Sequence, residues 1–328
     1  MTAPATARRR AVVVGTVSVD LVAGDVSAPT AQAAVGNSGA NIAVRLAADG
    51  WDVEMVALVG HDAAADLLRA DLERWGVGTT GVVGRVGYLT PRVFQVADAA
   101  DGGGSPSLLL ECPRCGRPRG HLLEVPRPDE LGPDVARAVR EADLLVVDVA
   151  DATTVELARV AQDGGTLVWF EASLRECLPP AMRDLAARSD VVKVSSEDLD
   201  HYTPALDSAE TAGALRVVTE GAEGVRYAGR GGWSRVPSAL DQPPVDTIGA
   251  GDAFTAAAAA ALVDGATPED ALVTASRAAA KTCLHLGARG DMLLPRSGGT
   301  AWIRDDAAFR CGRCEADPIE RQRPRAAG

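Results

Sequence analysis

The sequence lacks any long apolar run, because no stretch approaches the roughly 20 apolar residues that a helix needs to cross a bilayer. It also lacks a small-residue cleavage site behind the N-terminal arginines at 8–10, and the apolar run that follows them is short. We therefore expect a cytoplasmic protein without a membrane partner.

The chain has fewer basic than acidic residues. The chain has 33 Lys and Arg residues against 45 Asp and Glu residues, which gives a net charge of -12. A field of this sign repels phosphate backbones, so it argues against a nucleic-acid partner. We expect the small basic groups at 1–10 and 321–328 to lie in disordered tails.

Internal repeats and low-complexity segments are absent as well, and 47% of the 328 residues are hydrophobic. A chain of this size can bury a full core, as one large α/β domain or two ordinary ones. Short apolar runs at 144–149, 166–170, 190–194 and 216–219 alternate with helical patterns. This alternation predicts a mainly parallel sheet that is covered on both faces.

One stretch, residues 246–254, places two glycines directly before an alanine-rich segment that predicts a helix from about 250 to 263. Gly249 and Gly251 let the backbone turn its N–H groups toward one point, where the positive end of the helix dipole attracts a phosphate. Asp252 follows in the first helical turn, within reach of a hydroxyl that attacks this phosphate. The alternative is that the glycines only form a loop and Asp252 only favours the helix N-terminus.

The letters DTIGAGDAF at 246–254 resemble the C-terminal signature of the ribokinase-like (PfkB) carbohydrate kinases. The resemblance implies a three-layer αβα fold with a mainly parallel central sheet and a small β-strand lid. It also implies ATP as phosphoryl donor, Mg²⁺ as cofactor and possible use of K⁺ near Asp246. In this family pattern Asp252 is the general base, and Gly249, Ala250 and Gly251 form the anion hole.

Two N-terminal segments carry the same resemblance. Residues 11–16 predict a buried strand, which Ser18–Leu21 continue, and Asp20 matches the family aspartate that binds sugar hydroxyls. Residues 36–43 open a helix and resemble the motif Gly-Gly-x-x-x-Asn-x-Ala, although an asparagine replaces its second glycine. The resemblance thereby assigns substrate contacts to Gly36, Asn37 and Asn41.

A further substrate contact is implied for Arg175. Residues 170–175 resemble the Phe-Asp-x-Asn-x-Arg motif of fructokinase-like and 2-keto-3-deoxygluconate-kinase-like members. Glu171 and Ser173 replace the usual aspartate and asparagine, so the substrate of those members is not carried over. The simpler alternative for Arg175 is a surface ion pair.

Three blocks resemble the motifs with which members of this family bind the nucleotide and magnesium. Residues 192–199 match Lys-x-Ser-x-x-Glu, in which the final acid supports magnesium through water and is replaced here by an aspartate. The others are a Thr-x-Gly-x-x-Gly turn and a Gly-Ala pair near adenine. The implied nucleotide and magnesium residues are Ser195, Asp198, Thr219, Gly221, Gly224, Gly287 and Ala288.

Residues 90–111 change to short alternating stretches around a glycine-rich turn, which predict a β-hairpin. In the family such strands form the lid over the sugar and often pair two subunits. We therefore expect a kinase domain over 11–300 with lid strands near 22–35 and 88–112, a homodimer formed through the lid, and a C-terminal extension over 301–328.

Four cysteines are not explained by the resemblance. Cys112 and Cys115, and Cys311 and Cys314, form two C-x-x-C pairs, and the first has the Cys-Pro-x-Cys-Gly form of a zinc knuckle. Together they predict one closed, structural Zn²⁺ site that ties the C-terminal extension to the lid. Disulfides, redox chemistry and iron binding are the alternatives.

These observations together predict an enzyme that transfers the γ-phosphoryl group of ATP to a hydroxyl of a small sugar or sugar-like substrate. A nucleoside kinase of the same fold is the first alternative. A catalytically silent relative with a binding role is the second, and the retained Asp252 with its two glycines counts against it. The sequence does not identify the sugar.

Overall fold

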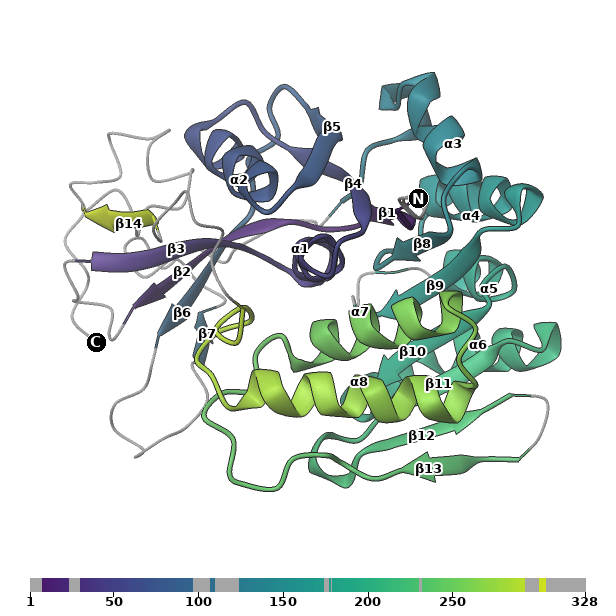
Figure 1. Cartoon of the computed structure of the whole chain (residues 1–328). Helices are drawn as coiled ribbons and strands as arrows, with labels where there is room; N and C mark the ends of the chain where they lie inside the picture. The colour runs from purple at the N-terminus through teal and green to yellow at the C-terminus, as the bar shows by residue number, and fades with distance from the viewer. Residues whose placement is uncertain are drawn as a thin grey trace, which may run out of the picture.

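The computed structural model describes residues 8–23, 30–96, 107–109, 124–173, 177, 179–229, 232–292 and 301–304. They form a large sheet with helices on both faces and a smaller sheet that projects from one end (Figure 1). This arrangement confirms the predicted α/β class, with a mainly parallel central sheet and a small β lid. Within the described ranges, no helix is both long and apolar enough to cross a membrane.

The large sheet has nine strands in the order β13-β12-β11-β10-β9-β8-β1-β4-β5. All neighbours from β11 to β5 pair in parallel, and β12 and β13 add an antiparallel edge. The strands are β1 (Arg10–Val14), β4 (Asp52–Val59), β5 (Val77–Gly84), β8 (Leu144–Val147), β9 (Leu167–Ala172), β10 (Val191–Ser195), β11 (Leu215–Thr219), β12 (Val225–Ala228) and β13 (Ser234–Val236).

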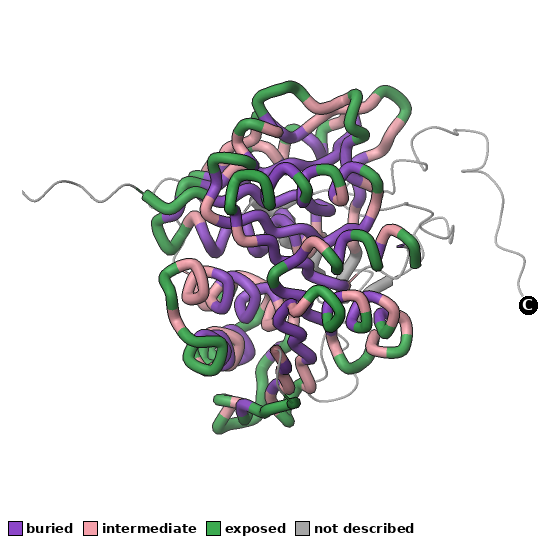
Figure 2. Tube along the Cα trace, turned by 90° about the vertical axis from the view of Figure 1, so that its right-hand side faces the viewer, coloured by how far each residue is buried: buried purple, intermediate pink, exposed green. Residues whose placement is uncertain are grey.

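Helices cover both faces of this sheet, so its strands are buried on two sides. Val13 and Val14 are neighbours in β1, and each is 0% exposed, yet they belong to different apolar clusters because successive side chains point to opposite faces. Figure 2 shows the buried stretches running through the middle of the molecule. The first cluster includes side chains of α1 (Ser38–Ala48), α2 (Ala63–Arg74), α7 (Ala250–Val263) and α8 (Pro268–Cys283), and the second those of α3 (Pro133–Arg140), α4 (Ala152–Gly164), α5 (Pro179–Ala186) and α6 (Leu199–Ala212).

The smaller sheet, here called the lid sheet, has the strand order β14-β3-β2-β6-β7. Its strands are β2 (Ser18–Ala23), β3 (Thr30–Gly36), β6 (Arg92–Val96), β7 (Ser107–Leu109) and β14 (Ala301–Arg304). Strand β14 comes from the segment that we assigned to a C-terminal extension, and it pairs with β3. The end of the described chain therefore contributes a strand to the lid sheet (Figure 1).

The sequence-based expectation about the length of the first strand is wrong. Residues 18–21 do not continue the first strand but form part of β2 in the other sheet. The N–H of Gly15 still bonds to the carbonyl of Val56 in β4, at 3.0 Å. The ladder of β1 ends after it, because the next N–H, of Thr16, bonds to a side chain instead of a strand. The chain is thereby released from the large sheet before it reaches Ser18.

The side chain that receives the Thr16 N–H is Asp148, at the carboxyl end of β8. Its carboxylate accepts the N–H of Thr16 at 2.9 Å and the N–H of Gly39, in the first turn of α1, at 3.0 Å. Burial raises the pKa of Asp148 to about 7. Strand β1 lies between β4 and β8, where the chain changes direction across the sheet, and ligands of open α/β sheets bind at such points. Asp148 therefore fixes the start of α1 at the expected ligand crevice.

Candidate active site

The N-terminus of α7 has the geometry of an anion site. Gly249 adopts φ 77°, in the left-handed region, and a Cβ there would lie 2.5 Å from the Cα of Ala288. Glycine is therefore required by both conformation and space. No side chain caps this helix end, and the N–H of Ala250 donates to the carbonyl of Thr247 at 3.2 Å. The positive end of the helix dipole is available to an anion.

Asp252 lies in the first turn of α7, and its residue surface is only 8% exposed. Asn41, on α1, donates a hydrogen bond from Nδ2 to the Asp252 Oδ2 over 2.8 Å. Burial raises the pKa of Asp252, whereas hydrogen bonds from Asn41 and Ser38 favour its charged form. The structure thus brings together two residues that the sequence placed in the base and substrate roles.

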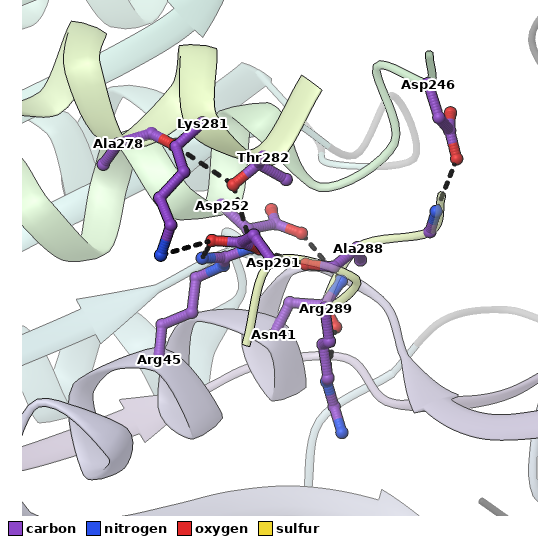
Figure 3. Close-up of polar contacts among 11 residues, drawn as sticks. Asn41, Arg45, Asp246, Asp252, Ala278, Lys281, Thr282, Ala288, Arg289 and Asp291 are labelled. Atoms are coloured by element: carbon purple, nitrogen blue, oxygen red, sulfur yellow. Dashed lines mark hydrogen bonds and ion pairs between the residues drawn. The ribbon is translucent and has the colours of Figure 1, made fainter. Parts of the chain in front are cut away.

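A loop after α8 closes over the start of α7. Arg45 of α1 donates from Nη2 to the carbonyl of Ala288 at 2.6 Å and pairs with Asp291 at 2.8 Å (Figure 3). The N–H of Gly287 bonds to the carboxylate of Asp246 at 2.7 Å. Sequence reasoning identified Gly287 and Ala288 but missed Arg45, because an arginine inside a helix gives no local sign that it is buried.

Arg289 follows directly in this loop and reaches toward α1 and α2. It donates from Nη1 to Asp71 Oδ2 at 2.7 Å and from Nε to Asn41 Oδ1 at 3.3 Å. The side chain is 11% exposed, and burial lowers the pKa of its guanidinium. This residue was also missed, although it stands next to the Gly-Ala pair that the sequence singled out.

The predicted substrate residues Asp20 and Gly36 lie on paired strands of the lid sheet. Asp20 accepts a hydrogen bond from Ser18 Oγ at 2.6 Å, and a Cβ on Gly36 would lie 1.9 Å from the Asp20 carboxylate. Asn37 adopts φ 71°, which few residues other than glycine do readily, and its side chain accepts the N–H of Ser38. It occupies the position where the family motif has its second glycine.

A buried ion pair lies beneath the start of α7. Glu171 and Lys193, whose side chains are 2% and 6% exposed, form an ion pair across β9 and β10. Thr255 of α7 donates to the same carboxylate at 2.6 Å. A Cβ on Gly251 would lie 3.2 Å from the Lys193 ammonium, so a positive charge sits under the anion site. No local pattern in the sequence predicts this pairing, and Glu171 stands out there only as a replacement for the family aspartate.

The predicted nucleotide residues lie at the carboxyl ends of neighbouring strands. Ser195 and Thr219 are partners in the register of β10 and β11, and Asp198 precedes α6 at its N-cap. Gly221 and Gly224, in the turn after β11, have φ 55° and 94°. Gly251, at the N-terminus of α7, lies against Lys193 of β10. This helix end is therefore close to the strand that carries Ser195.

Two groups of predicted site residues fall outside the described residues: Arg175, and the cysteines at 112, 115, 311 and 314. In the described ranges, no group of three or more His, Cys, Asp or Glu side chains could hold a metal ion. The remaining cysteines, Cys177 and Cys283, are buried and form no disulfide in the part of the chain that the structure describes.

Comparison with known proteins shows that the chain is similar to sugar kinases. A family model described as pfkB family carbohydrate kinase matches residues 122–294. The chain is 30% identical over 247 residues to fructokinase-1 of Oryza sativa subsp. japonica, covering 70% of this chain and 74% of the rice protein. It is 26% identical to the ribokinase of Bacillus subtilis (strain 168), over 87% and 96% of the two chains. The structure of Arabidopsis thaliana ribokinase complexed with ribose and ATP has a TM-score of 0.69 at 22% identity, covering 89% of this chain and 97% of that one.

Proposed function

The chain belongs to the pfkB family of carbohydrate kinases, and on this premise we propose that Asp252 is the general base with which it phosphorylates its sugar. The enzyme is an ATP-dependent phosphotransferase that acts on a sugar hydroxyl. One observation supports the residue assignment above the others: the Asp252 carboxylate is buried in the first turn of an uncapped helix, 2.8 Å from an amide of α1. A base and an anion site thereby share one helix end.

The chemistry follows from this arrangement. Asp252 accepts the proton of the attacking hydroxyl as its oxygen bonds to the γ-phosphorus, while the bond from the γ-phosphorus to the bridging oxygen breaks and ADP leaves. The N–H groups of Gly249, Ala250 and Gly251 then stabilise the charge that develops on the phosphoryl oxygens, aided by the helix dipole and the Lys193 ammonium beneath it. The N–H of Ala250 donates to the carbonyl of Thr247 at 3.2 Å, so it must leave or share that bond to reach the phosphoryl group.

We assign sugar binding to Asp20, Gly36, Asn37, Asn41 and Arg175, and nucleotide binding to Ser195, Thr219, Gly221, Gly224, Gly287 and Ala288. The close approach of β2 and β3 at Gly36 supports the first group, since a Cβ at this position would overlap the Asp20 carboxylate. Asp198 suits Mg²⁺, which keeps several waters and needs few protein ligands. When bound, Mg²⁺ neutralises charge on the phosphates of ATP.

A substrate panel tests the function. ADP release from magnesium-ATP should depend on the sugar offered, and fructose and ribose are natural first members because similar proteins are named fructokinase and ribokinase. Other pentoses, sugar acids and nucleosides complete the panel. Turnover with nucleosides alone would favour a nucleoside kinase, and ATP binding without turnover on any member would count against phosphorylation of a small sugar.

We further propose that Cys112, Cys115, Cys311 and Cys314 hold one structural zinc ion. Four thiolates are a donor set that suits such a site. The two C-x-x-C pairs follow β7 and β14, which both belong to the lid sheet. A zinc ion shared by them would join the two edges of the lid sheet.

Zinc removal gives the corresponding prediction. The purified chain should contain one zinc per molecule, and chelation should raise the KM for the sugar more than the KM for ATP, because the lid covers the sugar. Metal analysis and steady-state kinetics measure both quantities. Absence of zinc, or an unchanged sugar KM after its removal, would refute the proposal.

Three finer assignments remain predictions. We propose cytoplasmic localisation, a homodimer formed through the lid sheet, and a K⁺ ion near Asp246. The Asp246 carboxylate already accepts the N–H groups of Ile248 at 3.0 Å and Gly287 at 2.7 Å, so a cation there would share oxygens that are in use. Cell fractionation, light scattering and rates in KCl against choline chloride test the three in turn.

A further inference from the structure

We propose that Arg289 is a positioning residue for phosphoryl transfer: through Asn41 it orients the hydrogen bond that holds the Asp252 carboxylate. The inference rests on the proposed role of Asp252 as general base. Among the described residues, no hydrogen bond or ion pair joins Arg289 to Asp252 directly, so its effect passes through the amide of Asn41.

The contacts form one continuous chain of side chains from separate elements. Asp71 on α2 accepts from Arg289 Nη1 at 2.7 Å, Arg289 Nε donates to Asn41 Oδ1 at 3.3 Å, and Asn41 Nδ2 donates to Asp252 Oδ2 at 2.8 Å. Figure 3 shows Arg289, Asn41 and Asp252 converging beside the start of α1. The chain thus runs from α2 to the first turn of α7.

The direction of these bonds follows from the chemistry of the amide. An arginine can only donate, so it requires the oxygen of Asn41 to face it, and this leaves the NH₂ group for Asp252. A rotated amide would turn its oxygen toward a carboxylate, which also only accepts. Asn41 is 4% exposed, so water cannot readily replace the lost bond. Arg289 therefore selects the one amide orientation that supports the base.

Arg289 itself is held more tightly than a surface arginine. Its ion pair with Asp71 joins side chains that are 11% and 14% exposed. Its Nη2 atom is buried and has no hydrogen-bond partner in the part of the chain that the structure describes. A buried donor without a partner lowers stability, so the presence of an arginine here is better explained by function than by stability.

The other charged groups that face the base set the direction of the expected pH effect. Burial raises the pKa of Asp252 most, hydrogen bonding from Asn41 lowers it, Glu171 of β9 raises it, and Lys193 of β10 lowers it. On the other side, Asp71 and Asp20 face Arg289. Losing the Asn41 bond removes a lowering contribution, so the pKa of Asp252 should rise. The acidic limb of the kcat profile should then move to higher pH.

Two substitutions of Arg289 separate orientation from ordinary structural support. In Arg289→Gln the amide nitrogen stands at the chain position of Nε, so it can still donate to Asn41, whereas Arg289→Met has no donor. Both variants lose the ion pair with Asp71 and should lose stability alike. Arg277→Met, at an exposed position of α8, controls for removal of one positive charge.

We expect Arg289→Met to lower kcat by about tenfold to a hundredfold, which is typical of a misplaced catalytic group, and to move the acidic limb to higher pH. Arg289→Gln should stay within about threefold of the parent enzyme and keep its profile, since the orienting bond remains. Steady-state kcat and KM across pH on the best substrate of the panel measure both effects.

Two results would overturn the inference. The first is an equal loss of kcat in the Met and Gln variants. The second is a rise in KM with an unchanged acidic limb in Arg289→Met, which would make Arg289 a substrate contact only. Asp252→Asn measured alongside keeps the two proposals apart: if it is inactive while Arg289→Met keeps the parent profile, the base stands and only the role of Arg289 fails.

Discussion

Asp252→Asn is expected to lower kcat by about a thousandfold while leaving the KM for sugar and ATP nearly unchanged. The amide keeps the shape of the carboxylate and can still accept from Asn41, but it cannot take the proton of the attacking hydroxyl. Because the proton moves only in the transition state, the loss should appear in kcat. Steady-state kinetics of both enzymes on the same substrate measure it.

The folded state should tolerate this change. Burial opposes the charged form of Asp252, so a neutral amide should not lower the free energy of unfolding. Asp264→Asn at the C-terminal end of the same helix, where the side chain is 63% exposed, is the matched control and should keep full activity. A kcat for Asp252→Asn close to that of the parent would remove Asp252 from the mechanism.

The second large effect is expected at the buried ion pair. Lys193→Met should lower the free energy of unfolding by about 3–5 kcal/mol, because it leaves the carboxylate of Glu171 buried without its counter-charge. It should also raise the pKa of Asp252, since Lys193 lowers that pKa and Glu171 raises it. Urea unfolding and the kcat profile against pH measure the two consequences.

The partner substitution distinguishes this explanation from a simple loss of packing. Lys193→Met combined with Glu171→Gln should recover most of the lost stability, since no unpaired charge remains. Its kcat should be below that of the parent enzyme, because the anion site would lack the Lys193 ammonium. The other lysine of the chain, Lys281, is 65% exposed at its side chain, and Lys281→Met should change stability by less than about 1 kcal/mol. A double variant as unstable as Lys193→Met would show that lost packing, not charge, destabilises the fold.

The elements that the sequence predicted well are those that depend on local signals. Runs of valine and leucine mark the parallel strands because both of their faces are buried, and they require no knowledge of the partner strand. The start of α7 was equally predictable, since the glycines, the aspartate and the helical segment are consecutive. The passage of the chain from the large sheet to the lid sheet was not predictable. In the sequence, residues 18–21 look like a continuation of β1, but they belong to β2. The chain leaves the large sheet because Thr16 bonds to Asp148, more than 100 positions away.

By itself, therefore, the sequence determined the α/β class, the kinase family and the helix end that carries Asp252. Only the tertiary structure decided what surrounds that carboxylate: Asn41 lies 211 positions from it, Arg289 lies 218 positions from Asp71, and Glu171 meets Lys193 across two strands. The physical reason is that helix periodicity, strand burial and tight turns act between near neighbours. Hydrogen bonds and ion pairs between side chains depend instead on distances that exist only once the sheet has formed and the helices have packed on it.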